Sequence, residues 1–356
     1  MRRAMTVSSG TAAGLSLVLM LVSCGDTGSA GRTITIAFSP KSTSNPVFGP
    51  AIDGARVRAR ELTEAGPHRV EILIAAPEAQ DAMMQSDIIT AGAAAGEFDA
   101  LAISCTSAAD QIAAVDAVAA TVPVIAWDSD CTGSARDAFY SLDNTAAGRL
   151  AARLLARQIG DSGQVAILVD NQTGNLGARV AGFQAELAAS HPGITVARIV
   201  ECGAPAQDHL CPTLLEAAMT DFPDLRGWFF ASTWMRILAR GSTRPDLPEP
   251  IPPATQWQAE SMAGTIHTVA IDSLPEALPF VRDGRIDALI GQRYWGWGYD
   301  TVDLLYEMLI DGTAPPAFID SGTDVVCANN VEQYASSWTS NDFSLALPDC
   351  ALLDEL

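Results

Sequence analysis

The 356-residue sequence is almost without lysine: Lys41 is the single lysine, and all other basic residues are arginine. It contains four histidines, which form no recognisable acid–base or metal-binding pattern. It also has no Gly-x-Gly-x-x-Gly loop, no Gly-x-Ser-x-Gly elbow and no phosphate-binding loop. Neither Cys-x-x-Cys nor His-x-x-x-His spacing occurs, so a zinc site is not expected. These absences argue against an enzyme, a metal centre and a bound cofactor.

Long apolar runs are also missing, because the longest candidate, residues 14–22, is shorter than the roughly 20 residues needed to span a bilayer. Arg2 and Arg3 precede it and Ser23 follows it, which is the layout of a secretory signal. The Leu-Val-Ser-Cys segment that ends at Cys24 resembles the bacterial lipobox. This resemblance implies a signal peptide over residues 1–23 and a lipid on Cys24. An ordinary signal peptide cut near Ser23 is the alternative.

With a lipobox, residues 24–32 become a flexible tether, and the protein is expected in the periplasm or at the cell surface, anchored to a bacterial membrane. The formal net charge of the whole chain is −21. Removal of residues 1–23 takes away two arginines and no acidic residue, which makes the balance still more negative. Such a surface repels nucleic acid, so no nucleic-acid partner is expected.

Six cysteines remain after Cys24, and an even number in an exported chain favours disulfides. Six cysteines permit 15 pairings, which the sequence does not decide. Proximity in the sequence favours two pairs, and two predicted neighbouring strands favour a third: Cys202–Cys211, Cys327–Cys350 and Cys105–Cys131.

The length is suited to two domains, and short apolar strands alternate with helical segments along the chain. The expected strands are 33–38, 69–75, 99–104, 123–127, 164–169, 195–200, 227–231, 266–271 and 286–290. The expected helices are 46–65, 81–94, 108–120, 144–158, 174–190, 206–220, 273–283 and 294–311. Residues 240–264 are rich in proline and are expected to form an irregular insertion. The pattern predicts an α/β fold with two successive doubly wound sheets.

In such sheets, the loops at the carboxyl ends of the strands hold ligands. The loops here carry recognisable segments, namely PKSTSNPVF (40–48), WDSD (127–130), DNTAAGR (143–149), NQTGNL (171–176), RVAGF (179–183), Ile271-Asp272 and GRIDA (284–288) before Gln292. In this order they resemble the type I periplasmic sugar-binding proteins of ABC importers, the ribose-binding-like group. The WDSD segment is most similar to rhamnose- or autoinducer-binding members. The resemblance covers residues 33–326.

The resemblance implies two Rossmann-like lobes joined by a three-strand hinge. One lobe would comprise residues 32–142 and 293–322, the other residues 143–292 and 323–345, and residues 346–356 would form a tail. The implied function is capture of a small sugar-like ligand between the lobes, as a monomer, and its delivery to an ABC permease with its ATPase. Presentation of the ligand to a membrane sensor, without transport, is the alternative.

The same resemblance assigns the ligand-binding residues, which are Lys41, Asn45, Phe48, Asp128, Arg179, Thr233, Asp272 and Gln292. Planar carboxylate, amide and guanidinium groups can grip pairs of sugar hydroxyls, and an aromatic ring can cover an apolar sugar face. Helix capping by the aspartates, an exposed helical arginine and core packing of the phenylalanine are the alternative roles. Ser129 stands where the ribose pattern has arginine, Thr233 where it has asparagine and Val47 where it has an aromatic residue. These differences argue against ribose itself.

Two other classes of protein fit the sequence less well. A glycosidase could use two aspartates, but nothing in the sequence places Asp128 and Asp272 on either side of a scissile bond. A sugar-responsive transcription regulator shares the fold but needs a helix-turn-helix before the first strand and a basic surface. The sequence offers a secretory signal at that position and an acidic composition.

The lipobox yields the first prediction. Cys24→Ser removes the thiol that would carry the lipid, so the variant is expected to leave the membrane fraction and appear in the soluble exported fraction. Fractionation of cells that produce the wild-type chain and the variant at equal levels measures this. A variant that stays in the membrane fraction as the wild type does would contradict lipidation of Cys24.

Overall fold

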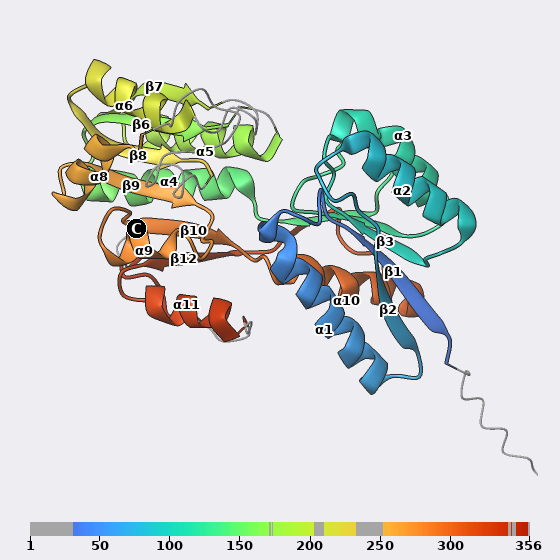
Figure 1. The fold of residues 1–356 in the computed structure, drawn as a ribbon. Coiled ribbons are helices and arrows are strands. Elements are labelled where there is room, and N and C mark those ends of the chain that lie inside the picture. Colours follow the sequence, from blue (N-terminus) through green and yellow to red (C-terminus); the bar gives the residue numbers. More distant parts are fainter. Residues whose placement is uncertain are drawn as a thin grey trace, which may run out of the picture.

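The computed structural model describes residues 31–170, 172, 174–202, 210–232, 252–340, 343 and 347–354. These residues form two α/β lobes, each built around a six-stranded sheet (Figure 1). Among them, no helix combines the length and the apolar character that crossing a membrane requires. The predicted class, two doubly wound lobes, is confirmed.

The first sheet has the strand order β11-β5-β4-β3-β1-β2, and all its pairings are parallel. Its strands are β1 (Thr33–Ser39), β2 (Arg69–Ile74), β3 (Ala100–Ile103), β4 (Val124–Trp127), β5 (Ala138–Ser141) and β11 (Phe318–Asp320). Alternate residues of β1 face opposite sides, so that Ile36 packs under α1 (Gly49–Ala65) and α10 (Gly296–Asp311), and Ala37 under α2 (Ala82–Ala95) and α3 (Ala108–Ala119). A short 3-10 helix, Pro46–Phe48, precedes α1.

The second sheet has the order β12-β10-β9-β8-β6-β7, and only β12 runs antiparallel to its neighbour. Its strands are β6 (Gly163–Val169), β7 (Ile194–Glu201), β8 (Leu225–Phe230), β9 (His267–Ile271), β10 (Ala288–Gln292) and β12 (Thr323–Cys327). Helices α4 (Asn144–Ile159) and α5 (Gly174–Ser190) pack on one face. The other face carries α6 (Cys211–Asp221), α8 (Thr255–Met262), α9 (Leu278–Arg282) and α11 (Val331–Ser340).

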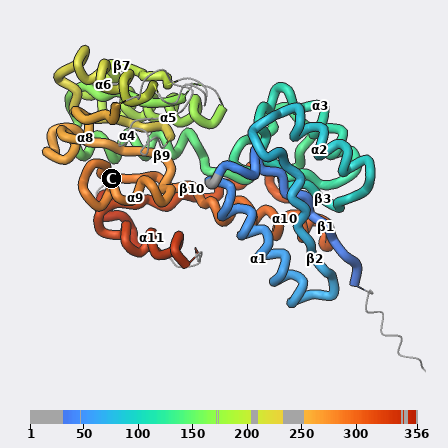
Figure 2. The backbone as a smooth tube through the Cα atoms, in the orientation of Figure 1, coloured from blue at the N-terminus to red at the C-terminus, as the bar shows by residue number. Residues whose placement is uncertain are grey.

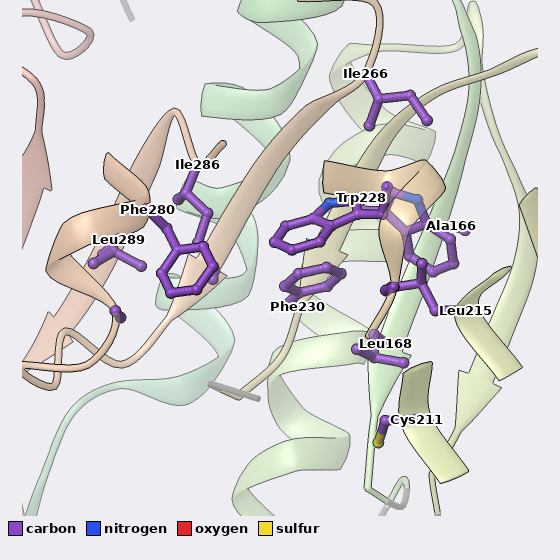
Figure 3. Packing of buried hydrophobic residues seen from close by; sticks show 14 of the residues in the cluster. Ala166, Leu168, Cys211, Leu215, Trp228, Phe230, Ile266, Phe280, Ile286 and Leu289 are labelled. Atoms are coloured by element: carbon purple, nitrogen blue, oxygen red, sulfur yellow. The ribbon is translucent and has the colours of Figure 1, made fainter. Parts of the chain in front are cut away.

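Large apolar side chains fill the core of the second lobe on the α6 side. Trp228 and Phe230 of β8 lie together there, with their ring centroids 6.0 Å apart (Figure 3). Phe280 and Ile286 pack beside them. Complete burial of each such side chain contributes about 1.5–3 kcal/mol, so this face contributes substantially to holding the helices on the sheet.

The chain crosses between the sheets three times within the described residues, after β5, after β10 and after β11. Figure 2 shows these crossings between the group of α1, α2 and α3 and the group of α4, α5 and α9. Two crossings lie side by side, because the backbone N–H of Ser321 donates to the carbonyl of Ser141 at 2.9 Å. Rotation about these connections can change the angle between the lobes without breaking either sheet.

The prediction of an irregular segment over residues 240–264 is wrong for its described end, because residues 255–262 form α8. This helix has no N-cap side chain of its own. Instead Glu216, on α6, accepts hydrogen bonds from the backbone N–H groups of Gln256 and Trp257 at 3.2 and 3.1 Å. Burial of Trp257 against Phe230 completes the anchoring. A local sequence pattern does not reveal a cap supplied by another helix.

The structure contains the three disulfides that proximity and strand order favoured. Cys105–Cys131 joins the loops that follow β3 and β4, with a Cα–Cα distance of 5.4 Å. Cys202–Cys211 connects the end of β7 with the start of α6, and Cys327–Cys350 ties residues 347–354 to the end of β12. The first of these bonds lies in the loops that lead to the candidate site.

In each lobe, one pair of helices meets backbone to backbone at glycines. A Cβ atom on Gly182 of α5 would lie 2.2 Å from the carbonyl oxygen of Thr145 on α4, and one on Gly148 would lie 2.0 Å from that of Arg179. Gly298 and Gly54 make the equivalent contact between α10 and α1. The α4–α5 contact fixes the position of Arg179 relative to the start of α4.

Gly182→Ala is therefore expected to force α4 and α5 apart and to lower the free energy of unfolding by about 1–3 kcal/mol, as for overpacked cores. Gly49→Ala is the matched control, because a Cβ atom there meets nothing within 4 Å. The control is expected to change stability by less than about 1 kcal/mol. Urea unfolding measures both, and equal stabilities for the two variants would contradict the close backbone contact.

Candidate ligand-binding site

The carboxyl ends of the parallel strands in both sheets border the crossings. The carboxyl end of β5 leads into α4 of the second lobe, and β4 runs parallel beside it. The carboxyl end of β10 leads into α10 of the first lobe, with β9 parallel beside it. Loops that follow strands in one lobe therefore lie next to the other lobe (Figure 1). Asp128 follows β4 directly and Asp272 follows β9 directly, so both occupy this border.

Both aspartates have left-handed backbone conformations. Of the non-glycine residues that the structure describes, three have positive φ: Asp128 at 58°, Asp272 at 81° and Asp161 at 58°. This conformation costs roughly 1–2 kcal/mol for a residue with a Cβ atom, although aspartate tolerates it better than most residues. Such outliers concentrate at functional sites.

In the first lobe, Asp128 is 6% exposed and one of its carboxylate oxygens is fully engaged. Oδ2 accepts a hydrogen bond from Ser104 Oγ at 2.8 Å and lies 3.1 Å from Lys41 Nζ. Lys41 also donates to Ser129 Oγ at 2.5 Å. Oδ1 accepts no hydrogen bond from the described part of the chain. The structure thus brings two of the predicted site residues together and leaves one carboxylate oxygen without a hydrogen-bond partner among the described residues.

Gln85, on α2, holds the loops beneath this pair. Its side chain is completely buried, and Nε2 lies within hydrogen-bond distance of the carbonyl oxygens of Ser39, Pro40 and Ser104. Its Oε1 accepts from the backbone N–H and the hydroxyl of Thr106. One amide therefore fixes the loop that leads to Lys41 and the loop that supplies the hydroxyl for Asp128.

In the second lobe, Asp272 is held in the same way. Its Oδ1 accepts hydrogen bonds from Gln292 Nε2 at 2.6 Å and from the hydroxyl of Tyr294 at 3.1 Å. Burial and the neighbouring Asp272 raise the pKa of Tyr294 well above its usual value, so this phenol stays protonated and donates. Oδ2 of Asp272 accepts nothing from the described residues. Gln292 is 5% exposed, and its Oε1 is buried without a hydrogen-bond partner among them.

Arg179 is 1% exposed, which excludes the exposed helical arginine considered from the sequence. Its Nε donates to Asn144 Oδ1 and its Nη1 to the carbonyl of Ala231, both at 2.8 Å. Its Nη2 is buried and has no partner in the described chain, and no described carboxylate lies within ion-pair distance. A buried charge with a free donor is costly, so this guanidinium favours an additional acceptor.

The structure does not group the other predicted residues with these: they are Asn45, Phe48, Thr233 and Cys24. Asn45 is exposed, and its Oδ1 accepts from the backbone N–H of Val47 at 3.1 Å within its own turn. Phe48 is 4% exposed, with its ring edge against Trp127, so stacking on a ligand would require the ring to leave this cluster. Thr233 and Cys24 lie outside the described residues.

The structure adds residues that the sequence did not indicate: Ser104, Gln85, Asn144 and Tyr294. Asn144 is the second residue of the DNTAAGR segment, but its contact with Arg179 depends on how α4 and α5 pack. The other three act through hydrogen bonds between segments that are distant in the sequence. No spacing in the sequence marks them.

Gln85→Leu is expected to lower the free energy of unfolding by more than about 2 kcal/mol, because it leaves buried carbonyl groups without donors. It should also speed amide hydrogen exchange at residues 128–129. Gln184→Leu, on the exposed face of α5, is the control and should change stability by less than about 0.5 kcal/mol. Comparable stability and exchange in the two variants would show that Gln85 does not hold these loops.

Comparisons with known proteins show which proteins share this fold. A search of curated proteins finds no match. A solved ABC-transporter solute-binding protein from Agrobacterium vitis, bound with α-D-tagatopyranose, is 25% identical with a TM-score of 0.69, over 86% of this chain and 98% of that one. A carbohydrate-transporter protein from Agrobacterium radiobacter, in complex with D-arabinose, is 25% identical with a TM-score of 0.68, over 86% and 98%.

A third solved structure supports the fold alone. It is a periplasmic solute-binding protein from Actinobacillus succinogenes with bound D-allose, 20% identical with a TM-score of 0.70, over 85% of this chain and 100% of that one. Residues 36–314 match the family model described as "Periplasmic binding protein domain", from β1 to just beyond α10. The chain therefore belongs to the type I periplasmic binding proteins, a family of extracytoplasmic proteins that bind solutes and do not catalyse reactions.

Proposed function

We propose that this chain is a lipid-anchored solute-binding protein that captures a small sugar between its lobes and delivers it to the permease of an ABC importer. The observation that carries the proposal is a set of polar side-chain atoms that have no hydrogen-bond partner among the described residues. One oxygen of Asp128 belongs to the first lobe. One oxygen of Asp272, Nη2 of Arg179 and Oε1 of Gln292 belong to the second.

These atoms suit hydroxyl groups. Three of the four accept hydrogen bonds and one donates, and a sugar hydroxyl can do both at once. The charges also balance without a charged ligand, since Lys41 lies against Asp128, and the second lobe supplies one guanidinium and one carboxylate. A neutral polyhydroxylated ligand therefore satisfies the site better than an anion or a cation. The bound sugars of the two relatives at 25% identity support the same class.

The mechanical units we propose are residues 32–142 with 293–322, and residues 143–292 with 323–345, with residues 346–356 as a tail. A ligand that bonds to Asp128 and to Arg179 touches both units, so it binds the closed arrangement better than the open one. Binding then shifts the population toward closure by rotation at the three crossings. The closed monomer, tethered through Cys24, is the form that a permease would recognise.

Thermal unfolding of residues 25–356 against a panel of sugars tests this proposal. D-arabinose and D-tagatose come first, followed by other pentoses, hexoses, deoxysugars, polyols and autoinducer-like sugars. A sugar at 100 times its dissociation constant adds about 2.7 kcal/mol of stability, which raises the melting temperature measurably. If no member of the panel raises it, the sugar class is wrong.

Variants of the proposed site residues test where the sugar binds. Asp128→Asn and Asp272→Asn keep the side-chain shape and tolerate the left-handed backbone, but lose the charge-assisted hydrogen bonds. Each is expected to weaken sugar binding by about 10- to 100-fold. Asp161→Asn is the matched control, because Asp161 has the same left-handed conformation and bonds to His191 instead. Calorimetry should give it wild-type affinity.

A further inference from the structure

Tyr294 lies on the second crossing, between β10 and α10, and is 1% exposed. Its ring belongs to the apolar core of the first lobe, where it meets the edge of Trp297 with the ring centroids 5.0 Å apart. Its hydroxyl reaches the second lobe, where it donates to Asp272 Oδ1 at 3.1 Å and accepts from the backbone N–H of Ser273 at 3.2 Å. The ring also lies 5.6 Å from that of Trp338 in α11, measured between centroids, so it packs between the first-lobe core and a second-lobe helix, while the hydroxyl bonds to the second lobe.

We infer that Tyr294 is a positioning residue that sets the orientation of Asp272 and links it to the angle between the lobes. The ligand role of Asp272 in this inference depends on the proposed function. The link itself depends only on the geometry of the ligand-free protein.

The two donors to Asp272 Oδ1 move with different lobes. Gln292 is the last residue of β10 and pairs with Thr323 of β12, so its amide travels with Asp272 in the second lobe. Tyr294, in contrast, packs its ring in the first-lobe core and against Trp338 of α11, so its hydroxyl is not carried by the second lobe alone. Rotation of the lobes therefore preserves the bond from Gln292 and changes the bond from Tyr294. Of the two contacts, the tyrosine bond is the one that is sensitive to the hinge angle.

The orientation of the Asp272 carboxylate depends on the bond from Tyr294, because the other oxygen, Oδ2, has no hydrogen-bond donor among the described residues. With Oδ1 held by two donors, Oδ2 of Asp272 is fixed in direction and remains open to a ligand. Loss of the tyrosine bond leaves only the amide of Gln292, and the carboxylate can then turn. The orientation of the ligand-binding oxygen and the hinge angle are coupled through this one hydroxyl.

A second buried tyrosine provides a control within the same network. The hydroxyl of Tyr334, on α11, bonds to Ser273 Oγ at 2.5 Å, one residue beyond Asp272. Tyr334 is 3% exposed, and its ring packs within the second lobe. Tyr294→Phe and Tyr334→Phe thus remove comparable buried hydroxyls, of which only the first connects the lobes.

The test measures the distance between the lobes in the ligand-free protein. Spin labels on unnatural amino acids at the exposed positions Arg60 and Gln184, in α1 and α5, report this distance without disturbing the disulfides. Tyr294→Phe is expected to broaden or shift the distance distribution, whereas Tyr334→Phe leaves it as in the wild type. A Tyr294→Phe distribution that superimposes on the wild type overturns the inference.

A double variant shows whether a change in the distance distribution comes from loss of this hydrogen bond or from a general loss of structure. Asp272→Ala removes the acceptor and should broaden the distribution as Tyr294→Phe does. The double variant should add nothing further, because both changes remove the same bond. Additive broadening would mean that the two residues act separately, and would also overturn the inference.

Measurement of sugar binding distinguishes a failure of this inference from a failure of the proposed function. If D-arabinose or D-tagatose stabilises the wild type, Tyr294→Phe should weaken its binding about 5- to 10-fold, as for one hydrogen bond, and Tyr334→Phe by less than about 2-fold. Equal losses in both variants would contradict a positioning role. If neither sugar binds the wild type, the proposed ligand class is at fault, while the distance measurement still decides whether Tyr294 links the lobes.

Discussion

The three crossings constrain the whole molecule. Each connects to the carboxyl edge of parallel strands, so the loops that follow those strands in one lobe lie beside the other lobe. Backbone bonds such as Ser321 to Ser141 keep two crossings adjacent. The polar residues of the site must lie at this border, because it is the one place where both sheets present strand ends to each other.

The site is assembled at a cost to stability, which the surrounding structure offsets. Two aspartates adopt left-handed conformations, and a buried guanidinium keeps one donor unused. Around them lie rigid supports. The glycine contact between α4 and α5 fixes Arg179, the amide of Gln85 fixes the first-lobe loops, and the Cys105–Cys131 bond closes the loop that contains Asp128. Preorganised groups of this kind spend less of the binding free energy on ordering side chains.

The sequence predicted what depends on local pattern. Apolar runs located nine strands, and motif order placed Asp128 and Asp272 at strand ends. The hydrogen bond from Gln292 to Asp272 was not predicted. Features that depend on distant partners were missed. Helix α8 takes its cap from Glu216 on α6, and Gln85 and Tyr294 act across segments far apart in the chain. Burial explains the remaining differences, since nothing local distinguishes a stacking Phe48 from a core one.

Both lobes contain polar atoms that lack a hydrogen-bond partner among the described residues. This arrangement explains why a ligand would drive closure in the proposed function. The described residues of neither lobe satisfy these atoms: the second oxygen of Asp128 has no donor among them and Nη2 of Arg179 has no acceptor. Each buried polar group left unpaired costs about 1–3 kcal/mol, and a hydroxyl-bearing ligand held between the lobes removes that cost on both sides at once. In the proposed function the hinge would therefore respond to occupancy of the site, and Tyr294 would couple that occupancy to the hinge angle through its hydrogen bond to Asp272.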